Sequence, residues 1–294
     1  MAPQTAPGSI VVGIDGSAGS LEALDWATDQ AAREHRPLTL LHGADPVAFA
    51  GGGDYPGAEH DYTGLRDEVR QRDVAMLEAA TARVRARHPD VEVGSVLSGD
   101  DPRNALLQLG ETAAMVVLGS RGLGPVASLL LGSVSVAVSR HATCPVVVLR
   151  PDSLAGGGVM VGVDGTEHSL PAVEFAFGMA SLRGCPLTVV HCYRDPAHRP
   201  GGQVGADGGP DLGEEEALTA EALAGMGEKF PDVPVDVHLV PGRGARELLA
   251  ASEGFALLVV GHHRRAPLHG LLHDPVATTL LEHARCPVAV VPSL

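Results

Sequence analysis

Short apolar runs alternate with longer stretches of helical period along the chain, a pattern typical of successive strand–helix–strand units. In the first half, the apolar runs lie near residues 10–15, 37–42, 91–97, 114–119 and 145–150. The helical stretches lie near residues 20–34, 65–88, 102–111 and 132–141. Because crossovers between parallel strands are right-handed, this order predicts an α/β fold in which an open, five-stranded parallel sheet carries helices on both faces. Ser20 and its counterpart Ser169 stand just before the first apolar helical positions, where we expect helix N-caps.

The second half of the chain repeats the first. IVVGIDGS at residues 10–17 matches VMVGVDGT at residues 159–166, which places Asp15 and Asp164 149 positions apart. Later the offset falls to 142, since Cys144-Pro145 matches Cys286-Pro287. We therefore predict two tandem Rossmann-like domains, domain 1 at residues 1–151 and domain 2 at residues 158–294, joined by a short polar, Gly-rich linker.

Two Gly-rich stretches, 43–64 and 195–213, separate the second predicted strand from the second helix in each copy. They should lie at the carboxyl edge of each sheet, where folds of this class bind ligands. The sequence leaves two interpretations open. Each stretch is either a mobile lid over a site or a bare flexible connection.

Charge and composition argue against several classes of function. A formal net charge of −15 opposes binding to nucleic acid or to anionic lipid. No apolar run approaches the roughly 20 residues of a membrane span, and residues 1–9 lack the features of a signal peptide. Four cysteines in a chain of this length do not make a disulfide scaffold, so we expect reduced thiols. We thus expect a cytoplasmic protein without nucleic-acid or membrane partners.

A candidate phosphate-binding motif follows the fourth apolar run of domain 1. Gly119, Gly122 and Gly132-Ser133 give the spacing G-x2-G-x9-G-[ST], between a predicted strand and a helix that begins near Ser133. Glycine lets backbone N–H groups approach phosphate oxygens, and a helix N-terminus adds unpaired N–H groups and a positive dipole end. The alternative is a Gly-rich turn that serves only the packing of helix on sheet.

Asp15 ends the first predicted strand and should project at the same edge as the glycine motif. Its carboxylate could accept hydrogen bonds from ribose hydroxyls or hold a divalent cation. It could instead cap the turn that it forms with Gly16 and Ser17, and the two roles are compatible. Arg121, inside the motif, either contacts phosphate or is solvated.

These segments resemble the universal stress protein family, in particular its tandem-domain, nucleotide-binding branch. The resemblance rests on the VVGIDGS opening, the LTLLH segment, the G-x2-G-x9-GS motif and the closing CPVVVLRP, so it covers nearly the whole chain. It implies an adenine nucleotide α-hydrolase-like fold that binds ATP with Mg²⁺, with Asp15 near the ribose and the metal. The implied phosphate contacts come from Gly119, Gly122, Gly132, Ser133 and Val134. The implied adenine contacts come from the backbone around Gly13, Ile14 and Leu41.

Domain 2 departs from the motif. The positions equivalent to Gly122, Gly132 and Ser133 hold Arg264, Asp274 and Pro275. An added Cβ, a negative charge at the helix entrance and the loss of a backbone N–H each oppose phosphate binding, although proline suits a first helical turn. We therefore expect an intact nucleotide site in domain 1 and a degenerate one in domain 2. Asp164 leaves open a nucleoside without phosphates.

No GKT-type lysine or general base accompanies the motif, so at most weak ATPase activity is expected. The favoured hypothesis is an ATP-binding stress-response sensor or regulator whose nucleotide occupancy changes its conformation or its choice of partner. The alternatives are a slow ATP-hydrolysing enzyme of the adenine nucleotide α-hydrolase type and a non-catalytic structural adaptor. Neither the stress nor the protein signalling partner follows from the sequence.

The last predicted strand of each domain, at residues 146–149 and 288–291, is apolar and would form an exposed sheet edge. Such edges tend to pair with another strand. We therefore expect an intramolecular pseudo-dimer of the two domains, which could pair again with a second chain as a homodimer.

Overall fold

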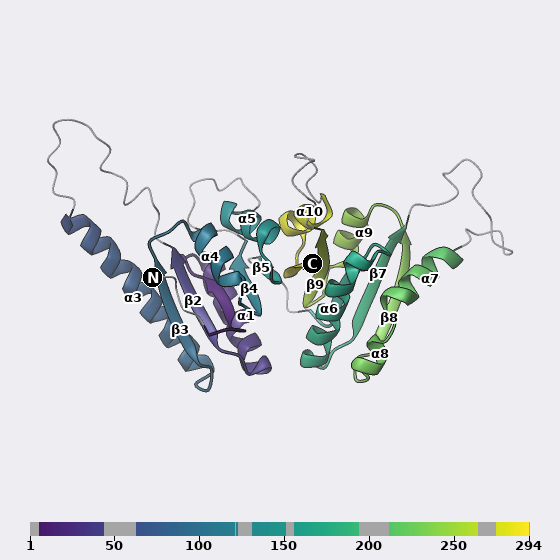
Figure 1. Cartoon of the computed structure of the whole chain (residues 1–294), viewed down its shortest axis with the longest axis horizontal. Coiled ribbons are helices and arrows are strands. Elements are labelled where there is room, and N and C mark those ends of the chain that lie inside the picture. Colours follow the sequence, from purple (N-terminus) through teal and green to yellow (C-terminus); the bar gives the residue numbers. More distant parts are fainter. Residues whose placement is uncertain are drawn as a thin grey trace, which may run out of the picture. The chain divides into compact units, whose positions relative to one another are not determined.

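The computed structural model describes residues 6–43, 63–120, 122, 131–150, 156–193, 212–263 and 275–293. The two Gly-rich stretches, each a candidate lid, lie outside these ranges except at their ends. Arg121, Arg264 and Asp274 also lie outside the described ranges. The chain divides into two compact units, Met1–Pro151 and Asp152–Leu294, which contain domains 1 and 2 (Figure 1).

Domain 1 is built on five parallel strands in the order β3-β2-β1-β4-β5. Their bounds are β1 (Ile10–Gly13), β2 (Leu38–Gly43), β3 (Val93–Ser98), β4 (Met115–Gly119) and β5 (Val146–Leu149). Strands β1, β4 and β5 are continuous apolar runs because helices cover both faces of the sheet at its centre.

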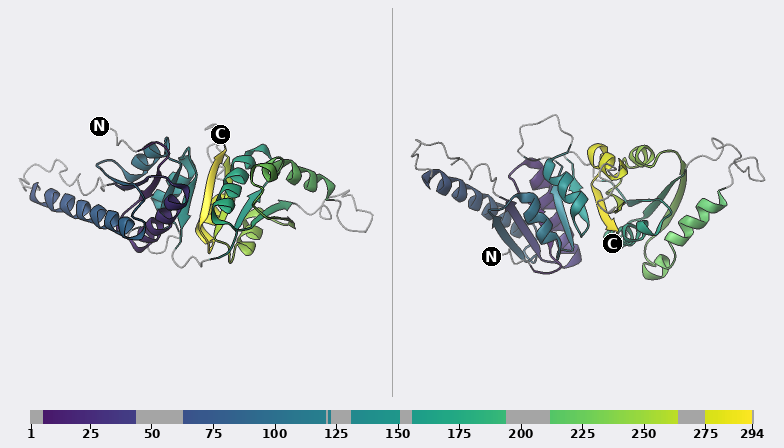
Figure 2. Two further views of the ribbon diagram at one scale, coloured as in Figure 1. Left: turned by 90° about the horizontal axis from the view of Figure 1, so that it is seen from below. Right: turned by 45° about the horizontal axis from the view of Figure 1, so that its top comes forward.

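Four helices lie in the described part of domain 1, and they are divided between the two faces of the sheet. They are α1 (Ala18–Glu34), α3 (Thr63–Arg87), α4 (Pro102–Gly110) and α5 (Ser133–His141). The path from β1 to β2 to β3 runs in one direction and the path from β3 to β4 to β5 in the other, so right-handed crossovers place α1 and α3 on one face and α4 and α5 on the opposite face (Figure 2). The predicted α/β fold is confirmed.

Domain 2 repeats this topology, with the strand order β10-β9-β6-β7-β8. Its strands are β6 (Val159–Val163), β7 (Leu187–Tyr193), β8 (Val235–Pro241), β9 (Leu257–His263) and β10 (Val288–Ser293). Its helices are the 3-10 turn η1 (Glu167–Ser169), α6 (Leu170–Arg183), α7 (Gly213–Ala222), α8 (Met226–Lys229), α9 (Gly244–Ala251) and α10 (Pro275–His283). The repeat seen in the sequence is therefore a repeat of the fold.

The start of helix α1 differs from the prediction. Ser17, not Ser20, is the N-cap, and its hydroxyl oxygen accepts a hydrogen bond of 3.2 Å from the backbone N–H of Ser20. The prediction of a Ser20 cap was wrong because the apolar helical pattern begins one turn inside the helix. In domain 2, Ser169 does occupy the N-cap position of α6, but its hydroxyl makes no capping hydrogen bond.

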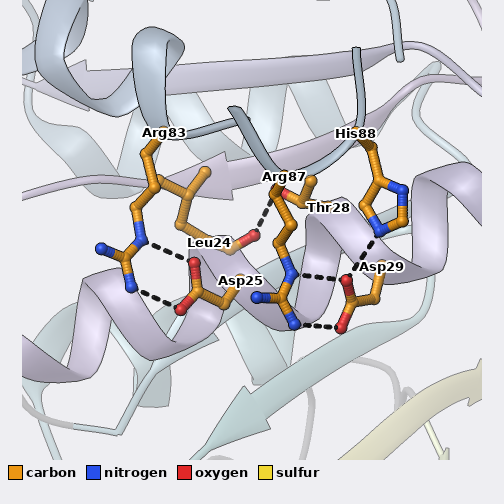
Figure 3. Close-up of polar contacts among 7 residues, drawn as sticks. All are labelled: Leu24, Asp25, Thr28, Asp29, Arg83, Arg87 and His88. Atoms are coloured by element: carbon orange, nitrogen blue, oxygen red, sulfur yellow. Dashed lines mark hydrogen bonds and ion pairs between the residues drawn. The ribbon is translucent and has the colours of Figure 1, made fainter. Parts of the chain in front are cut away.

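Two parallel ion pairs fasten helix α3 to helix α1 (Figure 3). Arg83 donates two hydrogen bonds of 2.6 Å to the carboxylate of Asp25, and Arg87 donates bonds of 2.6 and 2.8 Å to Asp29. His88 adds a contact of 3.0 Å to Asp29. Because the partners are four residues apart on each helix, the pairs align along one face and hold the C-terminal half of α3 in register with α1.

The reduced state expected for the cysteines agrees with the structure, in which Cys144, Cys185, Cys192 and Cys286 all carry free thiols. Within the described residues, no helix is both long enough and apolar enough to cross a membrane.

Candidate functional site

The carboxyl ends of β1 and β4 form the topological switch point of domain 1. Strands β2 and β3 lie on one side of β1, and β4 and β5 lie on the other. The helices that follow β1 and β4 consequently leave toward opposite faces, and doubly wound sheets bind their ligands at such a point. Asp15 lies two residues beyond β1, and Gly119 is the last residue of β4. Asp15 and the first glycine of the motif therefore both lie at the carboxyl ends of these neighbouring strands.

Gly122 lies against the carboxylate of Asp15. A Cβ placed on Gly122 would overlap Oδ2 of Asp15, so any side chain at position 122 would have to displace that carboxylate. The other oxygen, Oδ1, accepts a hydrogen bond of 2.9 Å from the backbone N–H of Ser17. Asp15 therefore closes the turn after β1 and faces the glycine motif at the same time.

Gly119 has a packing role. A Cβ at this position would lie 2.7 Å from the carbonyl carbon of Gly19 and 3.0 Å from the backbone nitrogen of Ser20. Both atoms belong to the backbone of α1, so neither can rotate away. A glycine is needed at position 119 so that α1 can pack closely against β4. This agrees with the alternative interpretation of the motif, in which its glycines serve the packing of helix on sheet.

Helix α5 begins at Ser133, as the motif predicts, and does so without a side-chain cap. Its N-cap is Gly132, which has no side chain to offer, and no side-chain hydrogen bond caps the first turn. The backbone N–H of Gly132 donates to the carbonyl of Ser120 over 2.7 Å, which ties the helix start to the end of β4. The first turn, which includes Ser133 and Val134, thus opens beside the glycine motif with its N–H groups directed out of the helix.

Ser120 carries an unsatisfied hydroxyl at this edge. The residue is fully buried, and its Oγ has no hydrogen-bond partner within the described part of the chain. A buried hydroxyl without a partner costs free energy, and such groups concentrate where a ligand or water completes the bonding.

Two of the backbone groups that the family resemblance assigns to adenine contact are joined to each other. The N–H of Ile14 donates to the carbonyl of Leu41 over 2.8 Å, and the carbonyl of Ile14 accepts a 2.7 Å hydrogen bond from Nδ1 of His42. A Cβ on Gly13 would lie 2.7 Å from a methyl group of Leu118, so a side chain at this position would require the Leu118 side chain to shift.

Sequence reasoning missed His42. Its Nε2 lies 3.5 Å from Oδ1 of Asp73 on α3, and both side chains are largely buried, at 14% and 13% exposed. In domain 2, His191 lies 3.1 Å from the carbonyl of Val163 and 2.7 Å from Oε2 of Glu215 on α7. The signal was present in the sequence, because the two histidines and the two acidic residues are separated by the 149- and 142-residue offsets of the repeat.

The equivalent edge of domain 2 is differently bonded. Oδ1 of Asp164 accepts hydrogen bonds from the Ser169 hydroxyl at 2.6 Å, from the Thr166 hydroxyl at 2.8 Å and from the Thr166 N–H at 3.0 Å. Burial alone would raise the pKa of Asp164, but these hydrogen bonds outweigh it and hold the pKa below its ordinary value. In domain 1 the hydroxyl of Ser20, equivalent to Ser169, donates to the carbonyl of Ser17 instead.

At the entrance of α10 in domain 2, Pro275 is the first helical residue and has no N–H group to offer a ligand. Gly261, the counterpart of Gly119, is less tightly enclosed, since a Cβ there would meet the carbonyl oxygen of His168 at 3.2 Å.

Comparisons with known proteins agree with this architecture. The model of the universal stress protein family matches the chain twice, over residues 8–150 and 158–292. Universal stress protein Rv2005c of Mycobacterium tuberculosis is 38% identical over 291 residues, which cover 96% of each chain. A universal stress protein of Mycolicibacterium smegmatis is 32% identical over 292 residues, again 96% of each chain.

Solved structures support the fold independently. A universal stress protein from Archaeoglobus fulgidus superposes with a TM-score of 0.72 at 17% identity, and covers 97% of this chain and 98% of its own. The similarity spans both domains. The tandem repeat, the shared topology and the two family matches together show that this chain belongs to the universal stress protein family.

Proposed function

We propose that this chain is an ATP-binding sensor or regulator of the stress response in which domain 1 alone binds the nucleotide. The observation that carries the proposal is the contact of Gly122 with the carboxylate of Asp15 at the switch point of the sheet, next to the uncapped start of α5. An oxygen ligand for ribose or metal and a set of backbone donors for phosphate then share one edge.

The residues of this edge suit ATP with Mg²⁺. The backbone N–H groups of Ser133 and Val134 and the Ser133 hydroxyl would hold phosphate oxygens, together with Gly119, Arg121 and Gly122. Gly132 contributes less as a donor, since its N–H already binds Ser120. Bound Mg²⁺ would neutralise phosphate charge, with Asp15 among its oxygen ligands. The adenine would lie against the backbone around Gly13, Ile14 and Leu41.

Domain 2 does not offer the same chemistry. The Asp164 carboxylate is bonded by its own turn, and Pro275 removes a donor from the helix that would face phosphate. We propose that domain 2 is a structural or regulatory partner of the nucleotide site. The expected pseudo-dimer or homodimer and the cytoplasmic location stay predictions.

Binding without efficient turnover fits the composition of domain 1, which contains no lysine at all. A phosphate-transferring site of the usual P-loop kind places a lysine on the phosphates. The proposed role is therefore retention of ATP as a signal, with nucleotide occupancy changing conformation or partner choice. Release of AMP and pyrophosphate from labelled ATP would instead favour an α-hydrolase.

Calorimetric titration of the full chain with ATP and Mg²⁺ tests the proposal. We expect one ATP bound per chain, and loss of binding in Gly122→Arg, whose added side chain displaces the Asp15 carboxylate. Gly157→Arg is the matched control, because a Cβ at Gly157 meets nothing within 4 Å. Equal affinity of Gly122→Arg and the wild type would refute the site.

A further inference from the structure

The side chain of Met76 on helix α3 lies over the turn that follows Asp15. Its sulfur is 3.0 Å from where a Cβ on Gly16 would stand. Gly16 has φ +81°, the left-handed conformation that glycine adopts without strain. The hydrogen bond of 2.9 Å from the N–H of Ser17 to Oδ1 of Asp15 closes the same turn. A chemical change at the Met76 sulfur therefore bears on the turn that orients the Asp15 carboxylate.

Domain 2 repeats this packing with a different side chain. Leu218 stands 142 positions after Met76, the offset of the repeat in this region, and its Cβ lies 3.3 Å from where a Cβ on Gly165 would stand. Gly165 has φ +75°, so the two turns are alike. Leucine and methionine are close in volume, and either can fill this space. The packing is thus common to both domains, while the oxidisable sulfur at this position is found in domain 1, where the nucleotide site is proposed.

Met76 is accessible to an oxidant in solution, because the residue is half-buried. Three other methionines in the described part of the chain, Met115, Met160 and Met179, are exposed by 2% or less. Met226 on α8 in domain 2 is half-buried like Met76. Among the described methionines, an oxidant should therefore react first at Met76 and Met226.

We propose that Met76 is an oxidation site through which hydrogen peroxide weakens nucleotide binding by domain 1. A lone pair of the thioether sulfur attacks one peroxide oxygen, and the O–O bond breaks as the S–O bond forms. The proton on the transferred oxygen passes to the departing hydroxide, which leaves as water. The sulfur loses the two electrons that the peroxide gains, and the product is methionine sulfoxide. The inference rests on the proposed nucleotide function of domain 1.

The sulfoxide does not suit the position of the thioether. The added oxygen is bonded to the atom that already lies against Gly16, and it turns an apolar side chain into a polar one. The side chain must therefore leave the turn or displace it. In both cases the hydrogen bond from Ser17 to Asp15 loses its cover, and the carboxylate that faces Gly122 is held less firmly. A methionine sulfoxide reductase would return the thioether, so the effect is reversible.

The test compares the ATP affinity of the full chain, with Mg²⁺ present, before and after treatment with hydrogen peroxide below neutral pH. Thiols are protonated and react slowly there, and a thiol reductant added afterwards reverses sulfenic acids and disulfides but not methionine sulfoxide. We expect the affinity to fall about tenfold, the worth of one hydrogen bond to a charged group. Mass spectrometry locates the added oxygen. Full oxidation of Met76 with unchanged affinity would overturn the inference, and so would oxidation of Met226 that spares Met76.

Three variants assign the effect to its residue. Met76→Leu introduces the side chain of domain 2 and should have the same ATP affinity before and after peroxide. Met226→Leu is the matched control and should lose affinity on treatment as the wild type does. Met76→Gln places a polar group over the turn and should bind ATP about tenfold more weakly than Met76→Leu without any oxidant. Equal losses on treatment in the wild type and in Met76→Leu would contradict the assignment to Met76.

A measurement without nucleotide separates the inference from the proposed function. Hydrogen exchange of the Ser17 amide can be followed by NMR in the ATP-free chain. We expect oxidation of Met76 to speed this exchange about tenfold, because the hydrogen bond to Asp15 is weakened. Faster exchange in a chain that binds no ATP even before treatment would refute the nucleotide function and retain the oxidation site. Unchanged exchange with Met76 fully oxidised would refute the inference itself.

Discussion

The packing of Gly119 on helix α1 predicts a large cost for a single methyl group. In Gly119→Ala the new Cβ would stand 2.7 Å from the carbonyl carbon and 2.8 Å from the carbonyl oxygen of Gly19. Non-bonded heavy atoms pack at about 3.5–4.0 Å, so α1 and β4 must separate by about 1 Å. Overpacking of this kind costs about 1–3 kcal/mol.

Urea unfolding of the full chain measures this cost in domain 1 alone, because Trp26 on α1 is the single tryptophan of the chain. With a urea dependence of about 2 kcal/mol per molar, the midpoint followed by Trp26 fluorescence should fall by about 0.5–1.5 M.

Gly261→Ala is the matched control in domain 2. Its Cβ would meet the carbonyl oxygen of His168 at 3.2 Å, a distance that a shift of a few tenths of an ångström relieves. The Trp26 transition of this variant should coincide with that of the wild type. A Gly119→Ala protein with an unchanged Trp26 midpoint would refute the packing role, and would leave ligand contact as the reason for a glycine there.

Three smaller effects follow from the described contacts. Arg87→Ala should lower the free energy of unfolding, measured by urea titration, by about 0.5–1 kcal/mol, because its ion pair with Asp29 is partly exposed. The loss should be smaller at high salt, which screens the pair, and a loss that grows with salt would contradict this. The hydrogen bond from Arg87, together with that from His88, outweighs burial and lowers the pKa of Asp29 below 3.8. The stabilisation that ionised Asp29 provides is therefore present above pH 3.8 and is lost as the pH falls through the lowered pKa. Asp29→Asn should make the urea midpoint of unfolding depend less on pH in this acidic range. Burial raises the pKa of Cys144 and Cys286 to about 11, so iodoacetamide at mildly alkaline pH should modify Cys185 in the native protein and spare these two; mass spectrometry that finds the buried pair labelled first would oppose the prediction.

Much of the fold could be predicted from the sequence because the central strands β1, β4 and β5 are buried on both faces and so appear as uninterrupted apolar runs. The five runs of domain 1 coincide with β1 to β5 to within a few residues, and the repeat extends the argument to domain 2. The start of α5 at Ser133 also followed from local signals. These features depend on short stretches of chain, where spacing and residue type carry the information.

Features that depend on contacts between distant segments could not be predicted in this way. Ser20 has the chemistry of a cap, but the turn closed by Asp15 gives that position to Ser17. Gly119 belonged to a plausible phosphate motif, while the backbone that excludes its Cβ comes from a helix 100 residues earlier. The contact of His42 on β2 with Asp73 on α3 joins residues that are far apart in the sequence, and only the parallel pair in domain 2 would have revealed it.

The central claim is that one of the two similar domains binds ATP, and a crystal structure of the full chain grown with ATP and Mg²⁺ tests it most directly. The account predicts one nucleotide per chain at the carboxyl ends of β1 and β4, with phosphates against the first turn of α5 and the ribose near Asp15. A nucleotide bound at the carboxyl ends of β6 and β9 in domain 2, with the edge of domain 1 empty, would contradict it.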